Sequence, residues 1–307
     1  MLRVYPDYYK DFRCIAGACK HSCCIGWEID IDPDTLDFYD NVGGDFGRRL
    51  KCGIDKTDSP HFILGESERC PFLNKENLCD IIINLGSEHL CHICREHARF
   101  INELPDRTEI GLGLTCEAAA RLILGKKEPF SLVGNGDLST DDALIHLRDN
   151  ILEVLQQRDF SVFERAENML LMLGTYLPEK TIAEWADILL DLERLDEKWT
   201  DVLMLIKNSG YTCFSELKST RFETEYEQLL CYFIYRHFAN AFDTNEAVPR
   251  AKLGALCFYI ILTAENCIRN KIGNFDFEEL AELCRMLSSE IEYSDENLDR
   301  LLDILYE

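Results

Sequence analysis

The sequence predicts a mainly α-helical protein with two parts: an irregular, cysteine-rich N-terminal metal-cluster domain and an all-helical C-terminal bundle. Three observations lead to this prediction. Cysteines concentrate before residue 117, apolar residues recur at helical spacing after residue 140, and residues 125–140 resemble a linker between the two patterns. We therefore place the domains at residues 1–125 and 126–307.

The N-terminal part is rich in turns, such as "NVGGDFG" and "DKTDSP", and its apolar segments are short. This is typical of folds organised around a metal centre, because the centre replaces part of the apolar core. "NVGGDFG" follows no apolar strand, so it is expected to be a loop and not a dinucleotide-binding turn.

The C-terminal part carries a succession of helix signals. Residues 139–157 have apolar residues at helical spacing, and Ser139 with Asp142 predicts a capping box before them. Thr181 and Glu184 form the same pattern before "TIAEWADILLDLERL". Further helices are expected at residues 160–176, 222–242, 249–269, 276–290 and 294–306. Since no alternating strand pattern interrupts them, we predict a helical bundle.

Composition and charge exclude some classes of function. The chain has 307 residues and a net charge of −24. Such a charge repels nucleic-acid phosphates, so nucleic-acid binding is disfavoured. It suits a basic partner that presents lysines, although solubility alone explains it equally well.

The expected compartment is the cytoplasm. "MLRVYPDYYKDFRC" lacks the apolar stretch of a secretory signal. The longest apolar run, "LGALCFYIILTA", is too short to span a bilayer and predicts a buried helix. No membrane segment is therefore expected.

Of the 15 cysteines, ten lie in residues 14–116. In a reducing compartment, clustered cysteines favour metal or redox chemistry over disulfides. The first four follow the spacing C-x4-C-x3-CC, which matches neither common zinc fingers nor ferredoxins. Cys23 and Cys24 are adjacent and cannot both point comfortably at one small ion, so they serve different roles or the site is a larger cluster. The five cysteines after residue 200 fall on apolar helix positions and are expected to pack as small hydrophobic residues.

Four cysteine-bearing blocks follow one another along the chain: "YYKDFRCIAGACKHSCCIGWEIDID", "CPFLNKENLCDI", "LGSEHLCHICREHARF" and "IGLGLTCEAAARLIL". Taken in order, they resemble the bacterial flagellin lysine-N-methylases and the related CxxCxxCC-type zinc- or iron-chelating domains. "LRDNILEVLQQRDFSVFERAENMLLML" and "YEQLLCYFIYRHFANAF" resemble the helical region of the same family. The resemblance therefore covers nearly the whole chain.

The resemblance implies a lysine N-methyltransferase that holds a [4Fe–4S] cluster and transfers methyl from S-adenosylmethionine to lysines of flagellin. The metal ligands that it implies are Cys14, Cys19, Cys23, Cys24, Cys70, Cys79, Cys94 and Cys116. Cys52 and Cys91 lie outside that set. His89, His92 and His97 flank the third block, but we do not assign them as ligands. The alternatives are a non-catalytic zinc- or iron-chelating or cluster-carrier protein, and a redox sensor whose thiols form disulfides.

Two acids are candidate catalytic residues. A lysine amine, with an unperturbed pKa of about 10.4, must lose a proton before it attacks a methyl sulfonium. Asp30 and Asp32 alternate, so in an extended segment they face one way and either would act as a base or hold the lysine. The alternative is a pair of solvated acids that cap the next turn.

Trp27, Arg95 and Arg99 are candidate residues for binding the methyl donor. Trp27 would stack on the adenine or the sulfonium, or else belong to the core. Arg95 and Arg99 lie one helical turn apart, so on a helix they would share a face and bind the donor's carboxylate. Ordinary surface ion pairs are the alternative for both arginines.

Overall fold

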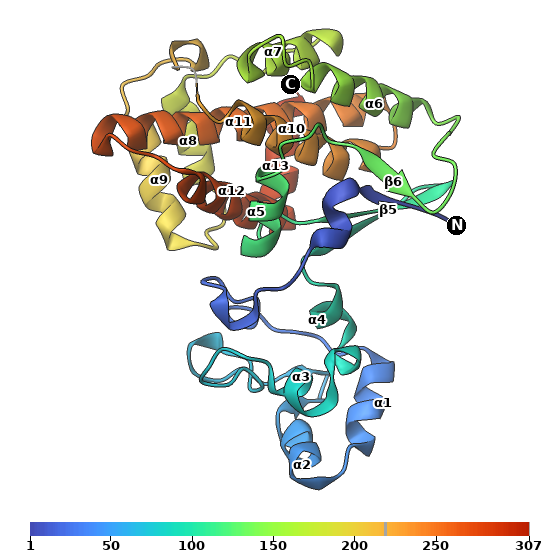
Figure 1. The fold of residues 1–307 in the computed structure, drawn as a ribbon. Helices are drawn as coiled ribbons and strands as arrows, with labels where there is room; N and C mark the ends of the chain where they lie inside the picture. The colour runs from blue at the N-terminus through green and yellow to red at the C-terminus, as the bar shows by residue number, and fades with distance from the viewer. Residues whose placement is uncertain (218–219, 307) are drawn as a thin grey trace. The chain divides into compact units, whose positions relative to one another are not determined.

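We describe the protein from a computed structural model, in which residues 1–217 and 220–306 are described. Within these residues helix predominates and strands are few, which confirms the mainly helical prediction (Figure 1). The chain divides into two compact units. Residues 13–99 form the cysteine unit, and residues 1–12 with 100–307 form the helical unit.

The cysteine unit consists of short elements. Its helices are α1 (Pro33–Asn41), α2 (Gly44–Cys52), α3 (Asp80–Leu85) and α4 (His92–Glu96), and its strands are β2 (Ile54–Asp55) and β3 (His61–Phe62). The 3-10 helices η2 (Ala16–Ala18), η3 (Glu66–Glu68) and η4 (Ser87–His89) lie between them. β2 and β3 pair antiparallel. Such short elements contribute little stability by themselves, so the unit depends on what fills its core.

The helical unit contains longer helices. They are α5 (Glu117–Leu124), α6 (Ala143–Leu155), α7 (Val162–Met172), α8 (Ile182–Leu190), α9 (Glu197–Lys207), α10 (Glu223–His237), α11 (Thr244–Ile272), α12 (Phe277–Glu292) and α13 (Asp295–Tyr306). The 3-10 helices η1 (Asp7–Asp11), η5 (Phe214–Glu216) and η6 (Phe238–Asn240) belong to the same unit. Each helix predicted after residue 139 is present. Helix α9 was not predicted, although its buried residues Trp199, Leu203 and Ile206 recur at helical spacing.

The division into units differs from the predicted boundary at residue 125. A four-stranded sheet runs in the order β4 (Arg99–Glu103), β5 (Arg107–Leu112), β1 (Leu2–Pro6) and β6 (Leu132–Gly134). β1 pairs parallel to β5 and antiparallel to β6. The hydroxyl of Tyr235 in α10 donates hydrogen bonds to the carbonyl oxygens of Val4 and Ile110, each at 3.2 Å. The chain's first residues and the segment after residue 99 thus join the helices, because β1 pairs with β5 and both strands accept hydrogen bonds from the Tyr235 hydroxyl of α10.

Capping confirms one local prediction and corrects another. At α8, the Thr181 hydroxyl accepts from the Glu184 amide while the Glu184 carboxylate accepts from the Thr181 amide, which is a complete capping box. At α6, the N-cap is Asp142 itself, whose carboxylate accepts from the amides of Leu144 and Ile145. The predicted box between Ser139 and Asp142 is therefore wrong, because the helix begins three residues later than that box requires.

Helix α11 is the core helix of the helical unit. By length and composition it could cross a membrane, but 94% of its most apolar window is buried inside the protein. The apolar run that looked too short to span a bilayer is thus part of a longer helix. Its interpretation as a buried helix is confirmed.

Glu292 is the centre of a buried polar network in the helical unit. Its carboxylate, which has no exposed surface, accepts hydrogen bonds from Tyr232 at 2.8 Å and Ser288 at 2.5 Å, and contacts His237 Nε2 at 2.6 Å and Arg236 Nε at 3.1 Å. Although burial opposes its ionisation, the charge of Arg236 and the contact with His237 lower the pKa of Glu292 to about 2. The network therefore holds α10 to the C-terminal end of α12 through an ionised carboxylate.

Candidate thiol site and pocket

The core of the cysteine unit gathers thiols. Cys70 and Cys91 are buried within it, and Cys24, Cys79 and Cys94 pack against it. All five are free cysteines. The local fold brings them in: the Cys70 amide donates to the Cys24 carbonyl at 2.9 Å. Cys79 and Cys91 are the N-cap residues of α3 and α4.

These thiols influence one another's ionisation. A hydrogen bond with Cys23 lowers the pKa of Cys24 to about 7. Burial raises the pKa of Cys70 to about 12. Cys94 donates a hydrogen bond to Cys91, so the pKa of Cys91 falls and that of Cys94 rises. The core thus holds both an easily ionised thiol and thiols that keep their protons.

The implied ligands are not all found in this core. Cys14 is exposed and its sulfur accepts from the Ala16 amide at 3.4 Å, while the Cys19 thiol donates to the His21 carbonyl at 3.3 Å. Cys116 is the N-cap residue of α5 in the helical unit, so its assignment as a ligand stays a prediction. Cys91, which the resemblance left out, is fully buried in the thiol core.

The chemical type of the core thiols favours a metal site, whereas their arrangement does not form one. Thiolates are the ligands that zinc and iron–sulfur clusters prefer, so the five core cysteines suit such a group chemically. Within residues 1–217 and 220–306, however, no group of three or more Cys, His, Asp or Glu side chains is arranged to hold a metal ion. The chemistry of the core thus fits a cluster, whereas the described arrangement contains no coordination site.

A cavity of about 280 Å³ lies in the same unit and brings two predicted residues together. Its lining comprises Asp32, Asp34, Thr35, Phe38, Glu88, His89 and Arg95. The rings of Phe38 and His89 stack with their centroids 4.2 Å apart. The next residue after Phe38, Tyr39, lies in the thiol core and donates a hydrogen bond to the His89 carbonyl at 2.8 Å. Helix α1 thus contributes both to the pocket and to the thiol core.

Asp32 has a structural task at this pocket. One of its oxygens accepts from the Thr35 amide at 3.0 Å and the other from the His92 amide at 2.7 Å. It therefore caps α1 and α4 together. Although desolvation opposes ionisation, these amides lower the pKa of Asp32. A carboxylate with a lowered pKa is a weak base, so this geometry favours the alternative in which the acid caps a turn.

The other candidate residues lie outside this pocket. Asp30 forms an isolated bridge with His61, and its carboxylate accepts from the Ser59 hydroxyl at 3.4 Å. The Trp27 indole is 40% exposed and donates to the Cys23 carbonyl at 2.8 Å, so it is neither a core residue nor part of the pocket lining. Asp30 and Asp32 thus contact different segments of the cysteine unit, and their assignment as catalytic residues stays a prediction.

Arg95 and Arg99 do not share a helix face, because α4 ends at Glu96 and Arg99 begins β4. Arg99 donates to the Arg95 carbonyl at 3.1 Å. Arg95 lines the pocket and contacts the Glu96 carboxylate at 3.4 Å, with its side chain 48% exposed. The expectation of a shared helical face is wrong, while Arg95 alone faces the cavity.

Sequence reasoning missed the stacked pair of Phe38 and His89. Phe38 is 37% exposed on α1, a feature that only the structure shows. Nothing in the sequence indicated that His89 would lie against it.

The comparisons with known proteins give a family-model match within the helical unit. Residues 169–307 match the family model described as the FliB lysine N-methylase C-terminal domain. The chain is 27% identical over 143 residues to the flagellar biosynthetic protein FliU of Salmonella muenchen, an alignment that covers 41% of this chain and 83% of FliU. No solved structure matches the chain.

Two further relatives are the lysine-N-methylases of Salmonella choleraesuis and Salmonella typhimurium. Each is 26% identical over 136 residues, which covers 41% of this chain and 33% of the relative. The aligned part thus spans a third of the length of these two methylases. Residues 169–307 of the chain are thus similar to the C-terminal domain of the lysine N-methylases.

Proposed function

We propose that the protein is a cytoplasmic lysine N-methyltransferase that uses S-adenosylmethionine, acts on flagellin and holds a [4Fe–4S] cluster in its cysteine unit. The observation that carries the proposal is the lysine N-methylase domain over residues 169–307. The flagellar name of the relative FliU supports flagellin as the acceptor. This domain does not favour the non-catalytic chelator or carrier.

The pocket lined by Arg95 supports a site for the methyl donor. The exposed guanidinium of Arg95 would bind the donor's carboxylate. The stacked rings of Phe38 and His89 offer a flat surface for adenine. The carboxylates of Asp34 and Glu88 line the same cavity and would accept hydrogen bonds from ribose hydroxyls. Asp32 then acts as a positioning residue, because it fixes α1 and α4 on which these groups lie.

Methyl transfer needs a neutral lysine amine. The amine lone pair forms the new C–N bond while the C–S bond of the sulfonium breaks and its electrons return to sulfur, so no electron carrier is required. Since the unperturbed lysine pKa is about 10.4, the rate should rise with pH through the neutral range. Desolvation of the lysine in a closed complex would lower its pKa and so increase the fraction of neutral amine that attacks the methyl group.

The residues that would hold the cluster are Cys24, Cys70, Cys79, Cys91 and Cys94. They share one core and are free. A bound cluster supplies a structural tie between the loops and short helices that carry these cysteines. Cys91, which the resemblance left out, joins four of the eight implied ligands in this core, namely Cys24, Cys70, Cys79 and Cys94.

The test combines labelling with donor binding. Anaerobically purified protein, methyl-labelled S-adenosylmethionine and flagellin should yield label on flagellin lysines. Arg95→Leu should weaken donor binding by roughly tenfold, whereas Arg48→Leu, an exposed arginine of α2, should leave it unchanged. Absence of labelled lysine from protein that contains iron and binds the donor would contradict the proposed activity.

A further inference from the structure

The sheet of the helical unit has an open edge with a regular backbone pattern. In the strand order β4-β5-β1-β6, β4 is an edge strand, so β5 alone pairs with it. The Leu104 amide donates to the Arg107 carbonyl at 2.9 Å, which makes these two residues a hydrogen-bonded pair at the turn between β4 and β5. Bonded and non-bonded pairs alternate along antiparallel strands, so Ile101 and Glu103 belong to non-bonded pairs. Their amides and carbonyls therefore point away from β5.

The free backbone groups of these two residues have no internal partner. In residues 1–217 and 220–306, no group outside the sheet bonds to the amide or carbonyl of Ile101 or Glu103. Ile101 is 48% exposed, and Glu103 is exposed as well. β4 contains neither proline nor lysine, the residues that commonly protect an edge from pairing with another chain. The edge therefore offers donors and acceptors at two alternate residues, a pattern that the backbone of an extended peptide matches.

The side chains of β4 alternate between two faces. The rings of Phe100 and Tyr235 of α10 have centroids 5.9 Å apart, and Asn102 Nδ2 donates to a carbonyl of α10 at 2.9 Å. One face of β4 thus packs on α10. Because successive side chains point to opposite faces, Ile101 and Glu103 lie on the other, outer face.

That outer face carries a row of apolar side chains. β1 pairs Tyr5 with Val133 of β6, and Val4 with Glu109 of β5, so the next residue of β5 lies beside Tyr5. The row across the four strands therefore consists of apolar residues: Ile101, Ile110, Tyr5 and Val133. Its two end members are exposed, whereas the middle two are half-buried. A strand added beside β4 would extend this row, which favours an apolar residue opposite Ile101.

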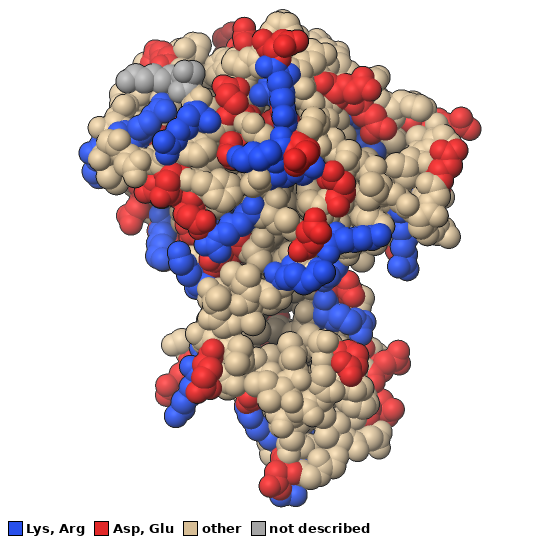
Figure 2. All heavy atoms as spheres, viewed as in Figure 1, with Lys and Arg blue, Asp and Glu red and all other residues tan. Residues whose placement is uncertain are grey.

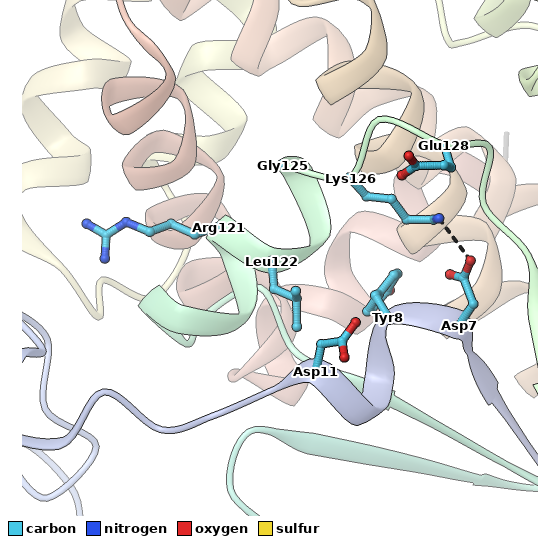
Figure 3. A pocket seen from close by; sticks show the side chains of 8 residues that line it. All are labelled: Asp7, Tyr8, Asp11, Arg121, Leu122, Gly125, Lys126 and Glu128. Carbon is cyan, nitrogen blue, oxygen red and sulfur yellow. Dashed lines mark hydrogen bonds and ion pairs between the residues drawn. The ribbon is translucent and has the colours of Figure 1, made fainter.

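The sheet is anchored within the helical unit, so its edge is a fixed template. The Tyr235 hydroxyl contacts carbonyls of both β1 and β5. Beyond β1, the Asp7 amide continues the pairing with β6 by donating to the Ser131 carbonyl at 3.0 Å. Figure 3 shows the Asp7 carboxylate bound to Lys126 after α5, at 2.9 Å. A template that is already ordered reduces the entropy lost when a peptide pairs with it.

Charge alone does not provide an equivalent site on the face that Figure 2 shows. Acidic and basic side chains are interspersed there and are not gathered by sign. At the open edge, by contrast, the carboxylate of Glu103 is exposed beside free backbone groups. A lysine directly opposite Glu103 on an added strand would form a favourable cross-strand pair. The edge therefore combines backbone pairing with a local preference for lysine.

We propose that β4 binds an extended segment of the protein partner as a fifth strand of this sheet. The backbone of that segment bonds to the amides and carbonyls of Ile101 and Glu103. An apolar side chain of the segment packs beside Ile101, and a lysine two residues away pairs with Glu103. The identity of the partner as flagellin rests on the proposed function. The strand pairing itself requires neither the methyl donor nor the cluster.

The first experiment follows amide hydrogen exchange of the full-length protein with and without flagellin. Residues 99–104 should exchange more slowly in the complex, because two amides that face solvent become hydrogen-bonded. Unchanged exchange in this segment together with new protection elsewhere would overturn the proposal, and so would the absence of binding.

Variants of Ile101 separate backbone pairing from side-chain contact. Ile101→Pro removes an outward amide without removing a bond of the sheet, so it should weaken flagellin binding by roughly tenfold. Ile101→Thr keeps the amide and loses only apolar contact, so it should weaken binding less. Thermal unfolding should be the same for both variants. Equal binding by Ile101→Pro and the wild type would overturn the proposal.

A charge reversal tests the same edge without altering its backbone. Glu103→Lys should weaken flagellin binding, because the added strand would then place like charges opposite each other. Glu179→Lys, at an exposed position outside the sheet, is the matched control and should leave binding unchanged. Equal losses in the two variants would show a general charge effect and overturn the lysine pairing.

A second copy of this chain is the other occupant that an open edge admits, and sedimentation distinguishes it from the partner. The protein alone should be a monomer. A dimer that Ile101→Pro dissociates would show that β4 pairs with itself, which would overturn the proposal.

Kinetics with flagellin distinguish this inference from the proposed function. Ile101→Pro should raise the KM for flagellin by roughly tenfold and change kcat little, because docking is lost equally from the ground state and the transition state. Flagellin binding that protects residues 99–104 without any methyl transfer would leave the docking strand standing and remove the proposed activity. Methyl transfer with an unaltered KM in Ile101→Pro would do the reverse.

Discussion

The two units solve the problem of forming a core in different ways. The helical unit buries a long helix, α11, among other helices, and its core is largely apolar. The cysteine unit has short helices and two-residue strands, and five of its core side chains are thiols. Apolar burial grows with the length of an element, so a unit of short elements needs a further tie. The comparison teaches that thiols share the core of the cysteine unit with apolar side chains such as Leu50, Phe62 and Phe72, whereas α11 supplies much of the core of the helical unit.

Removal of the proposed cluster should give the largest effect and unfold only the cysteine unit. Chelation of anaerobically purified protein should unfold residues 13–99, because binding of a structural metal contributes about 10 kcal/mol or more to a domain of this kind. Limited proteolysis with mass spectrometry should show new cuts there, while the thermal unfolding of the helical unit stays unchanged. Cys91→Ser should also increase proteolysis of the cysteine unit. Cys52→Ser should not, because Cys52 is exposed. A cysteine unit that remains protected would contradict the comparison.

Glu292→Ala should have the next largest effect, this time on the helical unit. The substitution leaves Arg236 and His237 buried without their anion, which costs about 3–5 kcal/mol. Urea unfolding followed by circular dichroism measures the loss, with Glu179→Ala as the exposed control. A change below about 1 kcal/mol would show that the network does not hold α10 to α12.

Acid should destabilise the helical unit through the same network. The pKa of Glu292 is about 2 in the fold, below its usual 4.5, so its stabilisation is complete above about pH 4.5 and is lost as pH falls towards 2. Burial lowers the pKa of His237 below 6.5, so its contribution also declines as pH falls below 6.5. Unfolding free energies at a series of pH values should decrease from pH 7 downward. Glu292→Gln should flatten the low-pH part of the curve, and an unchanged slope would argue against this assignment.

Helix caps should show the smallest effects and still separate the units. Asp32→Ala removes the cap of both α1 and α4 and should cost about 2 kcal/mol in the cysteine unit. Thr181→Ala removes one side of the α8 capping box and should cost about 1 kcal/mol in the helical unit. Hydrogen exchange of α1 and α4 in the first variant and of α8 in the second compares the two losses directly. If Asp32→Ala and Thr181→Ala reduced the protection of their own units from hydrogen exchange by the same amount, Asp32 would cap only one helix.

Local patterns in the sequence predicted most of the helical unit. The apolar spacing of residues 139–157 and the box of Thr181 with Glu184 depend on contacts three or four residues apart, which a sequence displays directly. The two errors in the helical unit, the missed helix α9 and the wrong capping box at Ser139, also concern local patterns. Helix α9 has buried residues at helical spacing, and Asp142 is the N-cap of α6 in place of Ser139. The sequence also showed that thiols matter before residue 117, by their number and spacing.

By itself, then, the sequence determined the helical content, the family resemblance and the concentration of thiols. The tertiary structure decided that β1 pairs with β5, that Cys70 and Cys91 lie in one core and that Phe38 stacks on His89. It also decided that Asp32, a candidate base, caps a helix that begins 60 residues further along the chain. Such contacts join residues far apart in the chain, and their free energy depends on burial and geometry that no local pattern encodes.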